Sequence, residues 1–328
     1  MLVRFSHLLK KILNKNSMKR TILIFIILIF YTCSIELLAQ TYTFKVLTFS
    51  GKVDFSTSSR ESWTQVQTGA SLKKDHKLRL DKNGYAALMY MDGRTIEMQD
   101  EGIFAINDLE QNMKNSKISV TQKFANFVAQ EIITDKSEKK DMKTFAAVVR
   151  VKPNHIDAAI PSFTSVLEPV IEFSWYSYPS SEKYIFSLLS SENTAIFMDL
   201  ADDTSYTLDT EKLKLYRGMV YKWYVFDAGN PKIISDTNAV NVISFDNRAL
   251  ILDTLQMLKE EIESNETPLS VLSLCSFFER NNLNVEALNQ FSKAILLAPE
   301  SEEYKNLFAK FLLKHKLYVR ASELIAEK

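Results

Sequence analysis

The side chains able to do chemistry are scattered along this sequence and form no recognisable catalytic motif. His76, His155 and His315 lie far apart and lack the spacing of metal ligands. The acids between residues 81 and 101 do not alternate as calcium-loop ligands do, so we interpret them as turn residues. A phosphate loop, a dinucleotide fingerprint and a Gly-x-Ser-x-Gly elbow are also absent. We therefore predict no catalytic, cofactor-binding or metal-binding residue, although a carboxylate pair would leave no local signature.

The composition argues against several further classes of protein. The 40 basic residues equal the 40 acidic ones, so the sequence predicts no polybasic surface for nucleic acid. Glycine is rare, because 7 in 328 residues is roughly 2%, against an average near 7%. Five of the seven fall in one short stretch and two come later: Gly51, Gly69, Gly84, Gly93 and Gly102, then Gly218 and Gly229. The length itself predicts two or three domains.

The amino terminus is typical of a secretory signal peptide over residues 1–40. Met18-Lys19-Arg20 precedes an apolar run, and a Leu-x-Ala sequence ends at Ala39. The run is shorter than the roughly 18–20 residues that cross a bilayer, so we expect cleavage near Gln40. An uncleaved membrane anchor is the alternative, and either Met1 or Met18 could be the start. The protein is expected to be exported, to the periplasm or the cell surface.

Cleavage would change both the charge and the cysteine content. It would leave 34 basic and 39 acidic residues, a net charge of about −5, which again disfavours phosphate-rich partners. Cys275 would be the one remaining cysteine, so no intramolecular disulfide could form.

Residues 41–112 show short alternating stretches divided by turns, which predicts a small all-β domain. Asp92-Gly93 predicts a hairpin with a type I′ turn, and Asn83-Gly84 predicts a second such turn. The expected strands are Tyr42–Leu47, Gly51–Ser56, Trp63–Val66, Lys77–Leu80, Ala86–Met91, Arg94–Met98 and Ile103–Ile106.

The ordered spacing in this stretch resembles the FecR-type extracytoplasmic domain. The matching residues are Gly51, Trp63, Gly69, Gly84, Asp92 and Gly93. Lys73–His76 departs from the family, which usually has a glycine-containing turn there. In its best-known regulators the domain is the periplasmic half of a signal relay that also has a cytoplasmic domain. Only about twenty residues precede the apolar run here, too few for such a domain, so we do not expect the relay function to transfer.

Residues 113–159 are expected to form a helix and a linker. The apolar spacing predicts an amphipathic helix over about 117–133 that covers one face of the β domain. Charges of both signs follow over residues 135–143, which indicates a solvated linker rather than a nucleic-acid patch.

Residues 160–246 return to strands with the lengths and separations of an immunoglobulin-like sandwich. Trp175, Gly218 and Trp223 lie in segments that resemble fibronectin type III-like modules. Alternation puts Tyr221 and Trp223 on one strand face, which favours core packing over a sugar-stacking platform. The expected strands are Val170–Trp175, Lys183–Leu188, Ala195–Met198, Ser205–Leu208, Met219–Asp227 and Ala239–Phe245.

Residues 247–328 change to a helical period. A helix over Ala249–Ile262 is expected, and Pro268 is placed to begin the next one. The spacing beyond it resembles the tetratricopeptide repeat, with Ala287, Ala294 and Pro299 at signature positions and a second, incomplete unit 34 residues on. Cys275 is interpreted as a small packing residue. Fewer than three repeats need a cap, from the first helix, the β domain or a partner.

The sequence thus predicts a multidomain β plus α protein: a FecR-like β domain, a β-sandwich and a helical repeat-like tail. We expect a non-catalytic exported binding or scaffold protein of the bacterial cell envelope whose tail contacts a protein partner. No cofactor is expected, and the membrane is contacted only if the leader stays attached. Two alternatives remain, an anchored envelope signalling component and a cell-wall or glycan hydrolase.

Overall fold

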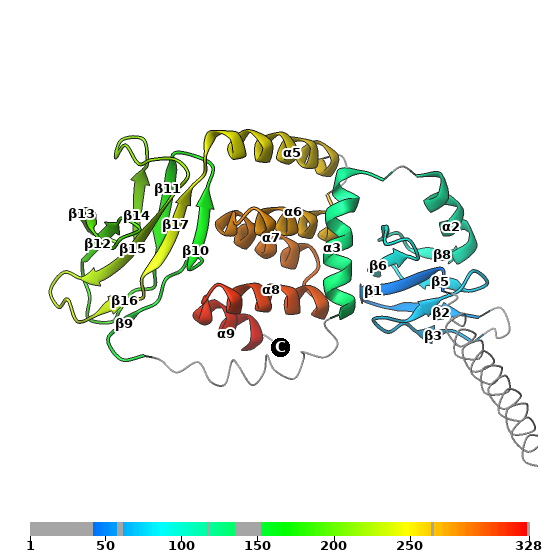
Figure 1. The fold of residues 1–328 in the computed structure, drawn as a ribbon. Coiled ribbons are helices and arrows are strands. Elements are labelled where there is room, and N and C mark those ends of the chain that lie inside the picture. The colour runs from blue at the N-terminus through cyan, green and yellow to red at the C-terminus, as the bar shows by residue number, and fades with distance from the viewer. Residues whose placement is uncertain (1–41, 58–61, 117, 135–151, 264–265, 327–328) are drawn as a thin grey trace, which may run out of the picture. The chain divides into compact units, whose positions relative to one another are not determined.

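The computed structural model describes residues 42–57, 62–116, 118–134, 152–263 and 266–326, and Figure 1 shows the elements they form. Thr43–Lys328 is one compact unit that combines β-sheets with helices, so the mixed β plus α fold class is confirmed. Within the described ranges, no helix is long and apolar enough to cross a membrane. The expected signal peptide and the charged linker over 135–143 lie outside those ranges.

The first part of the chain forms two four-stranded sheets, ordered β4-β1-β6-β7 and β3-β2-β5-β8. Their strands are β1 Phe44–Ser50, β2 Val53–Ser56, β3 Thr64–Gln65, β4 Ser71–Leu72, β5 Lys77–Leu80, β6 Tyr85–Tyr90, β7 Thr95–Met98 and β8 Gly102–Ala105. Alternating apolar side chains from both sheets, such as Phe44, Leu78 and Leu88, are fully buried between them. All seven expected strands occur, Lys77–Leu80 with its predicted bounds and the other six with shifted ends, and only the short β4 was not predicted.

The two glycine turns have different geometries from those predicted. Gly93 has φ +96° and closes a β6–β7 hairpin, but Asp92 has no positive φ. Tyr90 pairs with Arg94 across a three-residue loop, so the hairpin is correct and the type I′ turn is wrong. Gly84 is not at positive φ, and it joins strands of different sheets rather than a hairpin. Glycine fits there because a Cβ would lie 2.9 Å from the Asp81 carbonyl oxygen.

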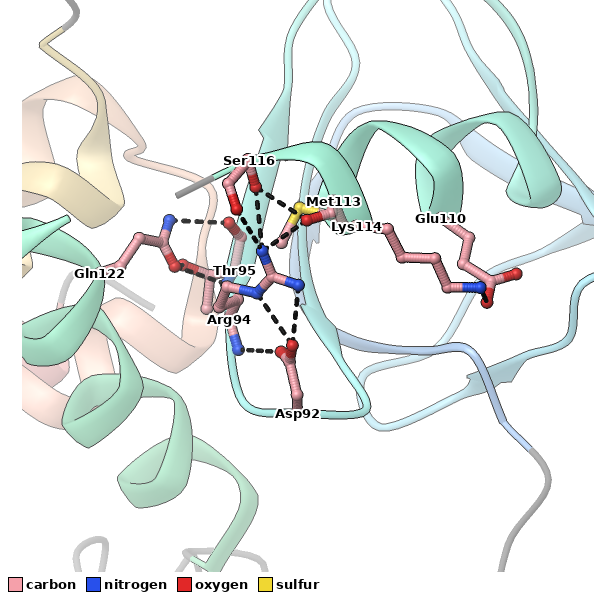
Figure 2. Close-up of polar contacts among 8 residues, drawn as sticks. All are labelled: Asp92, Arg94, Thr95, Glu110, Met113, Lys114, Ser116 and Gln122. Atoms are coloured by element: carbon pink, nitrogen blue, oxygen red, sulfur yellow. Dashed lines mark hydrogen bonds and ion pairs between the residues drawn. The ribbon is translucent and has the colours of Figure 1, made fainter. Parts of the chain in front are cut away.

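A helix that the sequence analysis missed, α2 (Ile106–Asn115), follows β8 directly. Its C-terminal carbonyls are satisfied by the buried guanidinium of Arg94, which donates to the oxygens of Met113 and Ser116. Asp92 holds that guanidinium in place through an ion pair of 2.8 Å, as Figure 2 shows. A cation at a helix C-terminus also complements the helix dipole.

The next segment forms a sandwich-like pair of sheets. The larger sheet runs β10-β17-β15-β12-β13 with β16 and β9 at its side, and β11 pairs with β14 in the smaller one. The strands are β9 His155–Ile156, β10 Phe163–Val166, β11 Val170–Ser174, β12 Tyr184–Leu189, β13 Ala195–Ala201, β14 Ser205–Asp209, β15 Met219–Asp227, β16 Ile234–Ser235 and β17 Asn238–Val242. Trp175, Tyr184, Tyr221 and Trp223 are all buried in its core, which agrees with core packing rather than a sugar platform.

The remaining helices are α3 (Val120–Thr134), α5 (Phe245–Glu263), α6 (Pro268–Arg280), α7 (Asn284–Leu297), α8 (Glu302–Lys314) and α9 (Tyr318–Ala326). Pro268 is the first residue of α6, as expected, and Thr267 caps it. Instead of lying mainly over the β domain, α3 packs along α6 and makes smaller contacts with β1 and β7. The contact of α3 with α6 is more extensive than the contact of α5 with α6. Thus α3, rather than the first helix of the tail, is the larger of the two covers on α6.

Several helix starts are completed by side chains from other segments. Thr164 of β10 accepts hydrogen bonds from the N–H groups of Asn284 and Val285, at 3.1 and 3.3 Å, where α7 lacks a side-chain cap of its own. Thr48 of β1 contacts Ser301, the N-cap of α8, at 2.8 Å. The unpaired first N–H groups of a helix need such acceptors.

Thr164→Val tests whether this borrowed cap stabilises the fold. The substitution keeps the buried shape but removes the acceptor for two N–H groups, so we expect the free energy of unfolding to fall by about 1–2 kcal/mol. Denaturant unfolding of the full chain measures it, with Thr207→Val at an exposed position of β14 as the matched control. Equal losses for the two variants would show that the cap contributes nothing.

Candidate binding groove

A groove of about 410 Å³ lies where α3, α6 and α8 meet. Each helix presents residues three or four apart, which share one helix face. The lining comprises Phe127, Val128 and Glu131 of α3, Leu272, Cys275, Ser276, Glu279 and Arg280 of α6, Leu307, Lys310, Phe311 and Lys314 of α8, and Phe291 of α7. Ser276 with Lys310 and Arg280 with Lys314 are 34 residues apart, so α6 and α8 contribute residues at the same spacing to the groove.

The floor of the groove is apolar. Leu272, Phe291 and Phe311 are buried, and Cys275 is 1% exposed. Burial, together with the nearby charge of Glu279, raises the pKa of the Cys275 thiol well above its ordinary value. The thiol therefore stays protonated at neutral pH, which fits a packing role and not that of a nucleophile.

The rim of the groove is charged and carries one exposed aromatic ring. Lys314 Nζ lies 3.0 Å from Glu279 Oε1, and the Arg280 guanidinium lies 3.8 Å from the centre of the Phe127 ring. Phe127 is 43% exposed despite that contact. An apolar floor with both charge signs at the rim can hold an amphipathic segment of another protein.

A second cavity, of about 440 Å³, contains the carboxylates of Glu97 and Glu261. Glu97 accepts hydrogen bonds from Tyr85 Oη, Thr267 Oγ1 and Leu269 N, the last at 3.0 Å. Burial raises the pKa of Glu97, although these hydrogen bonds oppose the rise. Glu97 therefore accepts from groups at the start of α6.

Glu261 has the corresponding role at α3. It accepts from the N–H groups of Val120 and Thr121 at 3.1 and 2.8 Å. Burial disfavours its charge, but hydrogen bonds from Thr121 and Val120 lower its pKa overall. Because both carboxylates already hold helix starts, their contacts account for their presence in this cavity without a reaction.

None of the twelve residues that carry the family resemblances lines the groove, although Cys275, interpreted from the sequence as a packing residue, does. Trp63 is half-buried, with the Arg79 guanidinium 4.4 Å from its ring centre. Gly51, Gly69 and Gly218 have positive φ, Ala287 and Ala294 are fully buried, and Pro299 is exposed just after α7. Together with Gly84, Asp92, Gly93, Trp175 and Trp223, they shape turns and cores. The groove residues were missed because they are brought together from α3 and the tail by tertiary packing.

The histidines remain separate in the structure. His155 lies 3.5 Å from Asp157, His76 stacks on Phe55, and His315 follows α8 beside Phe311. Over the described part of the chain, no group of three or more His, Cys, Asp or Glu side chains could hold a metal ion.

Comparisons with known proteins do not assign a family. No protein-family model matches the chain, and no curated protein matches it. A β-1,2-glucanase from Parabacteroides distasonis shares 13% identity over 43% of this chain and 24% of its own, with TM-score 0.23. The FN1–FN3 domains of chicken CNTN1 share 9% sequence identity over 62% of this chain and 55% of their own, with TM-score 0.21. The BSP domain of a biofilm associated protein shares 15% sequence identity over 60% of this chain and 25% of its own, with TM-score 0.19. The chain spans less than two thirds of each structure, and similarities this weak assign neither fold nor activity.

His315 makes the stability of the chain sensitive to acid. Burial, aided by the charge of Lys314, lowers its pKa from 6.5 to about 4. Because the unfolded chain binds the proton at the higher pKa, protonation of His315 favours unfolding. The free energy of unfolding therefore keeps its full value above about pH 6.5 and falls as the pH drops toward 4. We expect His315→Phe to reduce the loss between pH 7 and pH 5 in denaturant unfolding. The loss should not vanish, because burial also lowers the pKa of His76. Identical losses in the variant and the native chain would contradict this assignment.

Proposed function

We propose that this chain is a non-catalytic exported protein that binds a partner protein in the bacterial cell envelope through its helical tail. The observation that carries the proposal is the groove between α3, α6 and α8. Its floor is apolar, its rim is charged, and Phe127 remains exposed at its edge. Protein-binding surfaces commonly combine an apolar centre, an aromatic or arginine anchor and a polar rim.

In this proposal the β-sheets act as rigid supports for the tail. The resemblance of the first strands to the FecR-type domain, of the middle strands to fibronectin type III-like modules and of the tail to tetratricopeptide repeats supports a chain of binding modules. The contacts of Thr48 with Ser301 and of Glu97 with Leu269 support a fixed arrangement of these modules. A preformed groove loses less conformational entropy on binding than a flexible one.

Export can be tested at the amino terminus of the protein isolated from its own cells. We expect intact-mass and terminal-peptide measurements to find a chain that begins near Gln40 or Thr41, because the leader has the length and composition of a cleaved signal peptide. A chain that retains residues 18–39 and stays with the membrane fraction would instead favour the anchored signalling alternative.

The groove can be tested by filling it. Ser276 is half-buried on the α6 wall, so Ser276→Trp should occupy much of the roughly 410 Å³ and displace the partner. We expect crosslinked partner recovered from envelope fractions to fall at least fivefold, whereas Gln256→Trp at an exposed position of α5 leaves recovery unchanged. Circular dichroism checks that both variants fold.

A point substitution is preferable to removal of residues 247–328 because α3 packs on α6 and would lose its cover. Full partner recovery by a folded Ser276→Trp variant would place the binding surface elsewhere.

A further inference from the structure

A third hollow, a cleft of about 360 Å³, lies between the sandwich-like sheets and α7. Residues of β10, of β11 and of the connection between them line one side, and the first turns of α7 line the other. Apolar side chains contributed by both sides include Leu167, Ile171, Val285 and Leu288. This cleft is separate from the groove of the tail, since the two share no lining residue.

The strand β11 presents an open backbone edge to this cleft. One edge pairs with β14 from Val170 to Ser174. On the opposite edge, the Ser174 carbonyl accepts from Ala159 N at 2.9 Å, but among the described residues no strand continues this pairing along the rest of β11. Alternate residues of a strand direct their N–H and C=O groups to the same edge. The backbone groups of Glu172 and Val170 therefore point to the open edge.

The charges around this edge are predominantly negative. Glu168, Glu172 and Glu286 line the cleft, together with one cation, Arg320. Arg320 donates to Ser292 Oγ at 2.6 Å and lies over the Phe308 ring, and Glu168 pairs with Arg248 at 3.3 Å.

One acceptor in the cleft lacks a partner. Glu286 Oε2 is buried and has no hydrogen-bond partner among the described residues. A buried carboxylate oxygen without a partner is costly, and a cation would satisfy it. A positively charged group between α7 and the open edge of β11 would therefore be stabilised by Glu286.

We propose that this cleft binds an extended basic peptide segment of a partner protein, which adds a strand to the open edge of β11. The segment's backbone pairs with the N–H and C=O groups of Glu172, and a lysine or arginine side chain reaches Glu286. Strand addition supplies affinity through main-chain hydrogen bonds, and the side chains between the strand and α7 supply specificity. The net negative lining selects basic over acidic segments.

The probe is a fluorescent, end-capped hexapeptide of alternating Lys and Val, titrated with the full chain by anisotropy. Two peptides serve as controls: alternating Glu and Val reverses the charge, and alternating Lys and Pro keeps the charge but fixes every second φ at about −65° and removes those N–H groups, which disfavours a regular strand in either register. We expect the Lys-Val peptide to bind at least tenfold more tightly than either control. Glu286→Gln should weaken it roughly tenfold, whereas Glu192→Gln in the exposed β12–β13 turn and Ser276→Trp in the groove should not.

Hydrogen exchange gives the structural readout for the native chain. The Glu172 amide should exchange at least tenfold more slowly with the Lys-Val peptide bound. The proposal is overturned by absence of binding, by equal affinity for the Lys-Pro peptide, by an unaltered affinity of Glu286→Gln, or by unchanged exchange at Glu172. Loss of binding in Ser276→Trp as well would place the peptide in the tail groove instead.

Discussion

The first N–H groups of a helix cannot pair within the helix, and in this chain distant segments supply several of the acceptors. Glu97 of β7 accepts from α6, Thr164 of β10 from α7, and Glu261 of α5 from α3. Each of these hydrogen bonds joins two elements that lie more than a hundred residues apart in the sequence. Apolar burial supplies most of the free energy of such packing, but it is not directional. The directional hydrogen bonds at helix ends are what fix how the sheets meet the helices.

Charge follows the same rule at both kinds of helix end. β7 and the turn before it carry Glu97 toward the N-terminus of α6 and Arg94 toward the C-terminus of α2. Each sign matches the partial charge of the helix end that it contacts. A four-residue strand therefore connects two helices of different parts of the fold, and exchange of these two charges would oppose both dipoles at once.

The features that could be predicted from the sequence are local ones. The β15 strand was predicted with its observed bounds, because alternation over Met219–Asp227 is a property of neighbouring residues. The β6–β7 hairpin was predicted for the same reason. The turn at Gly84 was not, since whether the flanking strands share a sheet depends on pairings far away. The helix α2 was missed because its end depends on Arg94, and the groove because α3 and α6 meet across more than a hundred residues.

The packing of α3 on α6 has a consequence for how the chain reaches its fold. The whole sandwich-like segment is synthesised between these two helices, so the apolar face of α3, with Val128, Ala129 and Ile132, lacks its helical cover until α5 and then α6 emerge. Contacts so distant in sequence form slowly, and an exposed apolar face favours aggregation meanwhile. Binding of a chaperone to this face of α3 during synthesis would therefore reduce aggregation. If the chain is exported unfolded, α3 and α6 must also remain apart until export is finished.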